Sequence, residues 1–253
     1  MTNKTLAIIQ ARMGSSRFPG KSLVNIGEWS LIELVLKRAK RSSKIQEVIL
    51  ATSENQKDDV LESHVQQLGF PVFRGSEEDV LSRFVYAAIE YAPTTVVRIT
   101  GDCPLLSPSL IDKAIDCFIR KQVDYLALSI GEEKRKAYPR GLDVEVAKFS
   151  SLCEAAEKAT KKFEREHVMP YLYTHEKSYS TFILEPESEF SRPNYRLCVD
   201  TNQDLNFIRK LYEHFSNRLI DVEYQEIIQY LDLHPELVSI NQSVKQKHFT
   251  MSD

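Results

Sequence analysis

The residues best suited to chemistry lie in one loop, residues 11–21, which follows the apolar run Leu6–Ile9. It holds two glycines, two serines, two arginines and a lysine, namely Gly14, Gly20, Ser15, Ser16, Arg12, Arg17 and Lys21. Glycine lets a backbone approach a ligand closely, and backbone N–H groups and serine hydroxyls donate hydrogen bonds to phosphate oxygens. Open α/β sheets bind ligands at the carboxyl ends of their strands. Cations at such a place favour a polyphosphate ligand, and therefore nucleotide chemistry.

This loop matches neither of two common phosphate-binding patterns. The P-loop pattern G-x-x-x-x-G-K-[ST] needs four residues between its glycines, whereas five residues separate Gly14 from Gly20, although Lys21 and Ser22 follow. The dinucleotide fingerprint G-x-G-x-x-G is also missing from the loop. Taken alone, the loop could also be a basic surface turn, because turns are rich in glycine, serine and proline.

Two aspartates at predicted strand ends add a second kind of chemistry. Asp102 follows the β-branched run Thr95–Thr100 with Gly101 between them, and Asp200 follows the run Tyr195–Val199. On its own, Asp200 is better interpreted as the cap of the helix predicted after it. In a parallel sheet both carboxylates would share a rim with the basic loop. Because Mg²⁺ prefers oxygen ligands and commonly takes one or two carboxylates plus substrate phosphates, the three features together predict a Mg²⁺ site at Asp102 and Asp200.

Alternating strands and helices must position these residues. Apolar or β-branched runs predict strands over residues 6–10, 48–51, 71–73, 95–100, 125–129, 142–146, 180–184 and 195–199. Amphipathic segments with capping signals predict helices near residues 31–41, 55–67, 80–91, 107–120, 150–161, 164–173, 205–215 and 223–231. This order predicts an α/β fold, in which a mostly parallel, Rossmann-like sheet is flanked by helices.

The chain is expected to form one domain over residues 1–253, since this length suits a single large domain. The regular alternation of predicted strands and helices ends after residue 129, where the charged run 131–136 predicts a solvated loop. Apolar and acidic residues alternate over 142–146, which predicts a strand with one wet face. Residues 130–147 are therefore the candidate for a small extension within the domain.

Composition argues against several other kinds of function. A net charge of −3, with aromatic residues that do not interleave with a basic stripe, argues against nucleic-acid binding. No apolar stretch approaches the roughly 20 residues of a membrane span, and the first residues do not resemble a signal peptide. The four cysteines lack C-x-x-C spacing, which predicts reduced thiols, a cytoplasmic location and neither a disulfide nor a zinc site. Cys103 is disfavoured as a nucleophile because no histidine lies near it in the sequence.

The motifs together resemble one enzyme family. Residues 9–21 resemble the signature loop of the CTP-dependent sugar-acid cytidylyltransferases, which include the CMP-sialic acid and CMP-3-deoxy-octulosonate synthetases. The chain resembles more closely their SpsF branch, named for a spore-coat polysaccharide biosynthesis protein. The resemblance recurs in segments 73–83, 98–105, 139–145, 165–171 and 196–201, so it covers most of residues 5 to 215. It implies the GT-A-like fold of nucleotide-diphospho-sugar transferases.

This resemblance implies a role for each matched residue. Arg12 and Lys21 would hold the CTP triphosphate and neutralise the departing pyrophosphate, with Asp102 as the third catalytic residue. The nucleotide-binding set is Ala11, Arg12, Gly14, Ser15, Ser16, Arg17, Lys21, Arg74 and Arg83. The acceptor would face Arg140, Asp143, Glu145 and His167, and the metal would be held by Asp102 and Asp200. Relatives commonly form homodimers through an arm, for which residues 130–147 are the candidate here.

The expected function is transfer of CMP from CTP to a sugar, with a sugar acid favoured, and release of pyrophosphate in surface polysaccharide or glycan biosynthesis. Thr100 stands where the octulosonate enzymes have glutamine, so the identity of the sugar stays open. One alternative is a nucleotidyltransferase or GT-A glycosyltransferase with another nucleotide or acceptor. Asp102-Cys103-Pro104 lacks the second aspartate of the D-x-D motif that such a glycosyltransferase needs. Another alternative is a non-catalytic nucleotide-binding protein, which would be expected to lose one of the charged groups.

Overall fold

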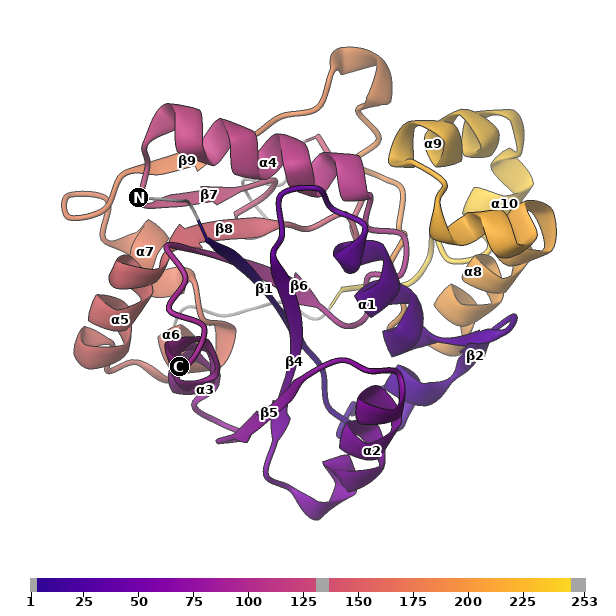
Figure 1. Cartoon of the computed structure of the whole chain (residues 1–253). Helices are drawn as coiled ribbons and strands as arrows, with labels where there is room; N and C mark the ends of the chain where they lie inside the picture. The colour runs from indigo at the N-terminus through magenta and orange to yellow at the C-terminus, as the bar shows by residue number, and fades with distance from the viewer. Residues whose placement is uncertain (1–3, 131–136, 247–253) are drawn as a thin grey trace.

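A computed structural model of the chain describes residues 4–130 and 137–246. Figure 1 shows a central sheet with helices on both faces. Its strands are, in spatial order, β5 (Val72–Gly75), β4 (Glu47–Ser53), β1 (Thr5–Gln10), β6 (Thr95–Thr100), β8 (Glu145–Lys148), β7 (Tyr125–Ala127) and β9 (Thr181–Ile183). β5, β4, β1 and β6 are parallel neighbours, whereas β8 runs antiparallel to both β6 and β7. The predicted mostly parallel sheet is therefore confirmed.

The described helices fall into two groups about this sheet. They are α1 (Leu31–Lys40), α2 (Asp59–Gln67), α3 (Val80–Ile89), α4 (Pro108–Lys121), α5 (Phe149–Lys158), α6 (Lys162–His167), α7 (Pro170–Thr174), α8 (Asn202–Phe215), α9 (Tyr224–Leu233) and α10 (Pro235–Ser239). Side chains of β1 alternate between the faces, as strand geometry requires. Ala7 and Ile9 pack in one core with α1, α4, α8 and α9, and Leu6 and Ile8 pack in the other with α3, α5 and α7.

Short elements complete the chain. A two-stranded hairpin, β2 (Asn25–Ile26) and β3 (Trp29–Ser30), precedes α1, and single turns of 3₁₀-helix occur at η1 (Lys21–Leu23), η2 (Gln56–Asp58), η3 (Ser188–Phe190) and η4 (Ser216–Ile220). The hairpin and α10 have no counterpart among the elements predicted from sequence. In Figure 1, α8, α9 and α10 gather at the side of the molecule that also carries α1 and β2.

Three predicted elements differ from the structure. The segment Tyr195–Val199 is not a strand of the sheet: it forms only an isolated bridge between Arg140 and Arg196. The strand expected at 142–146 begins later, at Glu145, and continues to Lys148. The helix expected at 164–173 is two helices, because Val168 between them has φ 72°, which a β-branched residue rarely adopts.

The candidate extension, residues 130–147, lies partly outside the described residues, because 131–136 are not described. Its described part packs into the chain's own core, where Tyr138, Leu142 and Val144 are at most 2% exposed. Glu145 to Ala147 then pair with β6 and β7 inside the main sheet. Residues 137–147 therefore contribute to the sheet and its core, and an arm formed by this region stays a prediction.

Candidate active site

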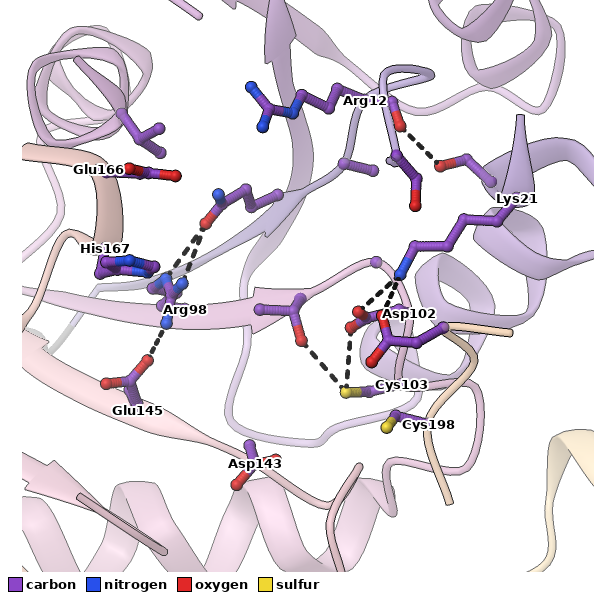
Figure 2. Close-up of a pocket in the computed structure, with 18 of the residues that line it drawn as sticks. Arg12, Lys21, Arg98, Asp102, Cys103, Asp143, Glu145, Glu166, His167 and Cys198 are labelled. Carbon is purple, nitrogen blue, oxygen red and sulfur yellow. Dashed lines mark hydrogen bonds and ion pairs between the residues drawn. The ribbon is translucent and has the colours of Figure 1, made fainter. Parts of the chain in front are cut away.

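A cavity of about 760 Å³ opens where β1 and β6 end (Figure 2). Every site residue predicted from sequence lines it except Arg74. The predicted residues that line the cavity are Ala11, Arg12, Gly14, Ser15, Ser16, Arg17, Lys21, Arg83, Asp102, Arg140, Asp143, Glu145, His167 and Asp200. Residues from loops, strands and helices far apart in sequence therefore meet in one place.

Arg74 is the exception: it does not line the cavity, and its contact with the nucleotide stays a prediction. Its guanidinium lies on α2, where Nη1 is 2.6 Å from Asp59 and 2.8 Å from Glu62. The remaining nitrogens donate to the carbonyl oxygens of Ser53 and Asn55 at 3.0 and 2.9 Å. Arg74 thus ties β5 to α2 and the end of β4, because carboxylates closer than the cavity satisfy its charge.

The basic loop is anchored by a buried carboxylate that sequence reasoning missed. Asp58 is 1% exposed, and its Oδ1 accepts a 2.6 Å hydrogen bond from the backbone N–H of Met13. Its Oδ2 accepts from both the backbone and the hydroxyl of Ser53 at the end of β4. The hydroxyl of Ser22 donates to the carbonyl of Arg12. A buried charge is tolerated where it is fully hydrogen-bonded, so Asp58 fixes the loop against the sheet.

Gly101 lets the ends of β1 and β6 come close together. A Cβ at this position would lie 2.7 Å from the Cβ of Ala11, which is closer than packed carbon atoms allow. The backbone N–H of Gly101 instead donates to the carbonyl of Gln10 at 2.8 Å. This close approach places Asp102 directly beside the basic loop. The sequence signal for it was the glycine between a buried strand and a carboxylate.

Lys21 joins the two aspartates. Figure 2 shows Lys21 pointing to Asp102, and its Nζ lies 2.8 Å from Asp102 Oδ2. The same Nζ lies 2.8 Å from Asp200 Oδ1 and 2.9 Å from the carbonyl oxygen of Val199. Burial alone would lower the Lys21 pKa, but the two carboxylates outweigh burial and raise it. Burial likewise favours a higher pKa for Asp102, but the Lys21 ammonium holds that pKa below its ordinary value. Lys21 and Asp102 are therefore both charged at neutral pH. We call Lys21, Asp102 and Asp200 the aspartate end of the cavity.

Asp200 also contacts two arginines. Its Oδ2 accepts from Arg17 and from Arg196, each at 2.8 Å. Arg17 was predicted as a phosphate ligand and Arg196 was not predicted at all. Each oxygen of Asp200 therefore has a different cationic neighbour, with Lys21 on Oδ1 and the arginines on Oδ2.

The aspartate end suits a magnesium ion. Among the described residues there is no cluster of three or more histidine, cysteine or acidic side chains that could hold a metal by itself. Asp102 and Asp200, however, both direct an oxygen to the single point that Lys21 Nζ occupies. Mg²⁺ commonly binds one or two carboxylates and completes its shell with water and substrate phosphates. The two convergent carboxylates supply such oxygen ligands, and the cationic loop beside them suits the substrate phosphates.

Two further predicted arginines differ in how they are paired. Arg12 forms an ion pair with Glu77 at 3.1 Å and remains 42% exposed. Arg83 is only 1% exposed, and its Nη1 donates to the carbonyl oxygen of Ser76 at 2.8 Å. Its Nε has no hydrogen-bond partner among the described residues, and burial lowers the Arg83 pKa to about 10. Arg83 is thus still a cation at neutral pH, and it lines the cavity.

A second charged group lies at the other end of the cavity. Arg98, in the middle of β6, forms an ion pair with Glu145 on β8. Glu145 also accepts a 2.6 Å hydrogen bond from the hydroxyl of Tyr125. The Nε and Nη2 of Arg98 donate to the side-chain oxygen of Gln10 at 3.3 and 3.1 Å. His167 lies beside Arg98 in Figure 2. We call Arg98, Glu145 and His167 the Arg98 end.

Arg98 and Gln10 were not predicted as site residues. The available signal was a single charged residue inside the apolar run Val96–Ile99, which a buried strand tolerates only with a partner. Burial lowers the pKa of His167, and the positive charge of Arg98 lowers it further. The strained backbone of Val168 follows His167 directly, and strain of this kind concentrates at functional sites.

Arg140 and Asp143 are brought to the cavity by a close backbone approach. Gly141 has φ 98°, and a Cβ there would lie 2.5 Å from the backbone nitrogen of Cys198. Asp143 accepts a 2.8 Å hydrogen bond from the hydroxyl of Ser129. Cys103 and Cys198 also line the cavity, but burial raises the pKa of both thiols. They are free cysteines that stay protonated, which agrees with the expectation that Cys103 is not a nucleophile.

Comparison with known proteins assigns the class. The chain belongs to the cytidylyltransferase family, which it matches over residues 6–229. It is 36% identical over 239 residues to the spore coat polysaccharide biosynthesis protein SpsF of Bacillus subtilis, covering 92% of this chain and 96% of that protein. A 3-deoxy-manno-octulosonate cytidylyltransferase of Leptospira interrogans is 38% identical over 116 residues, which are 44% of this chain and 45% of that enzyme.

A solved structure agrees with this assignment. A cytidylyltransferase of Leptospira borgpetersenii has a TM-score of 0.86 and 30% identity to this chain, covering 98% of this chain and 100% of that one. Family and fold together make this chain a nucleotidyltransferase that uses CTP. Within the described residues, no helix is long and apolar enough to cross a membrane.

Proposed function

We propose that the protein transfers CMP from CTP to a sugar acid and releases pyrophosphate, in the synthesis of a surface polysaccharide or glycan. The observation that carries this proposal is the contact of Lys21 with both Asp102 and Asp200 at 2.8 Å, beside the basic loop and inside one cavity. The names of the relatives, one a polysaccharide biosynthesis protein and the other an octulosonate cytidylyltransferase, support the acceptor class and the pathway.

The loop supplies the cations that the reaction needs. Pyrophosphate leaves the α-phosphorus with growing negative charge, and pre-positioned cations stabilise such charge in the transition state. Lys21 and Arg12 would hold the triphosphate there, with Ser15, Ser16 and the backbone of Gly14 as donors. Phosphoryl transfer asks little covalent chemistry of the protein, so holding the acceptor oxygen in line with the leaving group is its main task.

Asp102 and Asp200 would hold Mg²⁺. When bound, that ion would polarise the α-phosphate and favour an ionised acceptor hydroxyl. Lys21 contacts the same two oxygens, so its ammonium must move toward the phosphates when the carboxylates bind the ion. The flexible four-carbon stem of lysine allows this movement.

The Arg98 end would receive the acceptor, together with Arg140 and Asp143. It offers a guanidinium, carboxylates and an imidazole that is neutral at pH 7, which match the carboxylate and hydroxyl groups of a sugar acid. A homodimer and a cytoplasmic location belong to the same proposal, through the resemblance already described.

Pyrophosphate release tests this function. The purified protein would be given CTP, UTP, ATP or GTP with MgCl₂ and a panel of sugar acids and matching neutral sugars. We expect release with CTP and one or more sugar acids. Asp102→Asn should lower the rate on the order of 100-fold or more, because one oxygen ligand loses its charge. The matched control is Asp116→Asn, since Asp116 is 51% exposed and pairs with Lys44 away from the cavity.

Either of two results would contradict the proposal. Equal turnover with UTP or with a neutral sugar would show that the proposed substrates, CTP and a sugar acid, are wrong. A native rate for Asp102→Asn would show that Asp102 does not hold the metal.

A further inference from the structure

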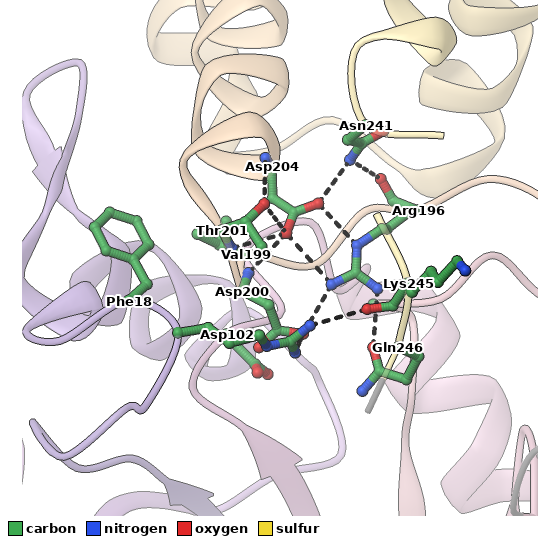
Figure 3. Close-up of polar contacts among 12 residues, drawn as sticks. Phe18, Asp102, Arg196, Val199, Asp200, Thr201, Asp204, Asn241, Lys245 and Gln246 are labelled. Carbon is green, nitrogen blue, oxygen red and sulfur yellow. Dashed lines mark hydrogen bonds and ion pairs between the residues drawn. The ribbon is translucent and has the colours of Figure 1, made fainter. Parts of the chain in front are cut away.

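The end of the described chain reaches the aspartate end of the cavity. Residues 241–246 follow α10, and Figure 3 shows Lys245 and Gln246 beside Arg196 and Asp200. The carbonyl oxygen of Lys245 accepts a 3.0 Å hydrogen bond from Nη1 of Arg17. The side-chain oxygen of Gln246 accepts a 2.9 Å hydrogen bond from Nη1 of Arg196, and Gln246 lines the cavity. This segment therefore contacts both arginines that bind Asp200.

Arg196 is the centre of a buried network. It is 7% exposed, and its Nε and Nη2 donate to Asp204 at 2.8 and 3.3 Å. Asp204 is fully buried at the start of α8, where its Oδ2 accepts from the backbone and hydroxyl of Thr201, each at 2.9 Å. Asn241 donates from Nδ2 to the carbonyl of Arg196 and to Asp204 Oδ1, each at 3.0 Å. The helix cap thus fixes one edge of the Arg196 guanidinium, and Gln246 contacts another of its nitrogens.

This network decides how Asp200 is oriented. Arg17 and Arg196 both contact Oδ2, while Oδ1 faces Lys21 and the cavity. A carboxylate held at one oxygen by two guanidinium groups cannot turn without losing both charge-assisted hydrogen bonds. Oδ1 is therefore the oxygen that is presented beside Asp102.

We propose that residues 241–246 are a positioning segment of the active site, which sets the direction of Asp200 by holding Arg196 and Arg17 on its outer oxygen. Arg196, Asn241 and Gln246 act as positioning residues, since they reach the reacting groups through Asp200. This inference rests on the proposed function of Asp200 as a metal-holding carboxylate. It adds a part of the site that is remote from the loop and from both aspartates in sequence.

A glutamine pair in this segment allows a matched test. Gln246→Ala removes the contact with Arg196, whereas Gln242→Ala removes an exposed glutamine four residues earlier. The Kd of CTP in MgCl₂ would be measured by calorimetry, with the Mg²⁺ dependence of turnover and the Tm of each variant. For Gln246→Ala we expect CTP binding and Mg²⁺ affinity to weaken about three- to tenfold, the cost of one ordinary hydrogen bond, because Gln246 acts on Asp200 only through Arg196. Its Tm should stay within about 2 °C of the wild type.

Arg196→Lys gives a stronger test of the same network. Lysine keeps the charge but cannot contact Asp200, Asp204 and Gln246 with one planar group. We expect it to weaken Mg²⁺-dependent turnover about tenfold or more and to shift the Mg²⁺ requirement upward, beyond any change in Tm.

Two outcomes are decisive. If Gln246→Ala and Arg196→Lys both matched Gln242→Ala in Kd, Mg²⁺ dependence and turnover, the positioning role would be overturned while the proposed function stood. If the wild-type protein failed to bind CTP in MgCl₂, the proposed function would be overturned, and this inference with it.

Discussion

The two ends of the cavity are held in place by different means. At the aspartate end the backbone takes part, because the carbonyl of Val199 accepts from Lys21 and its N–H donates to the carbonyl of Asp102 at 2.8 Å. At the Arg98 end the side chains hold one another, since Glu145 accepts from both Arg98 and Tyr125. Backbone contacts keep their geometry when side chains change, whereas contacts between side chains are altered by a single substitution.

Under the proposed function, this difference would separate the residues that take part in the transfer from those that select the acceptor. The aspartate end lies beside the loop, where the groups common to every nucleotide triphosphate would bind. The Arg98 end is built from β6, β8 and the break between α6 and α7, and its charges are closely paired. We therefore expect changes at the aspartate end to reduce turnover with every acceptor. Changes at the Arg98 end should alter the choice of acceptor and spare CTP.

The largest effect is expected from Lys21→Met, which keeps much of the side-chain volume and removes the charge. Loss of this cation should lower kcat/KM for CTP on the order of 100-fold or more, since it contacts the phosphates in the proposed transition state. The same variant should gain stabilisation by MgCl₂ without nucleotide, because Lys21 no longer occupies the point where Asp102 and Asp200 converge. Steady-state kinetics and thermal shift measure the two effects.

Lys44→Met is the control for that variant, since Lys44 is 42% exposed and pairs with Asp116 away from the cavity. A native kcat/KM for Lys21→Met would show that the Lys21 ammonium does not stabilise the transition state. Unchanged MgCl₂ stabilisation would show that the ammonium does not compete for the two carboxylates.

The aspartate end was predictable because its signals are local. Gly101 and Asp102 directly follow a β-branched strand, and Lys21 closes a loop of unusual composition. Asp200 was also singled out, although the run before it proved not to be a strand. Arg140 donates to the carbonyl of Tyr195 and accepts from the N–H of Leu197, while the N–H of Val199 donates to the carbonyl of Asp102, so a single bridge forms and no ladder follows.

The Arg98 end was harder to predict because its contacts are long-range. Arg98 contacts Glu145 because β8 lies antiparallel between β6 and β7. No local sequence pattern predicts this position of β8. Asp58 and Arg196 were missed in part for the same reason, since each also bonds to a residue far away in sequence, Met13 for Asp58 and Gln246 for Arg196. Arg74 shows the limit of matching a motif, because its position in the sequence does not reveal that acidic residues of α2 already pair with its charge.

Glu145→Gln should have an intermediate effect and test the Arg98 end alone. It removes the charged partner of Arg98 and leaves the guanidinium to be held by its hydrogen bonds to Gln10 and by a neutral amide. The acceptor KM should rise about tenfold, while the Kd of CTP stays within about twofold of the wild type. Glu154→Gln is the control, since Glu154 is 55% exposed and pairs with Lys158. A rise in the Kd of CTP equal to the rise in acceptor KM would show that the two ends do not act separately.

The smallest effect concerns the stability of the Arg98 end at mildly acidic pH. Burial, and then the charge of Arg98, hold the pKa of His167 below its ordinary value of 6.5, while Glu166 opposes them. The unfolded chain therefore binds this proton more readily than the folded one, so stability is present above pH 6.5 and is lost as the pH falls toward the lowered pKa. His167→Asn cannot bind the proton and should lose about 1–3 °C less in Tm than the wild type between about pH 7 and about pH 5.5. Parallel loss of Tm in both proteins would mean that protonation of His167 costs the folded state nothing, and that the imidazole is better solvated than its position beside Arg98 implies.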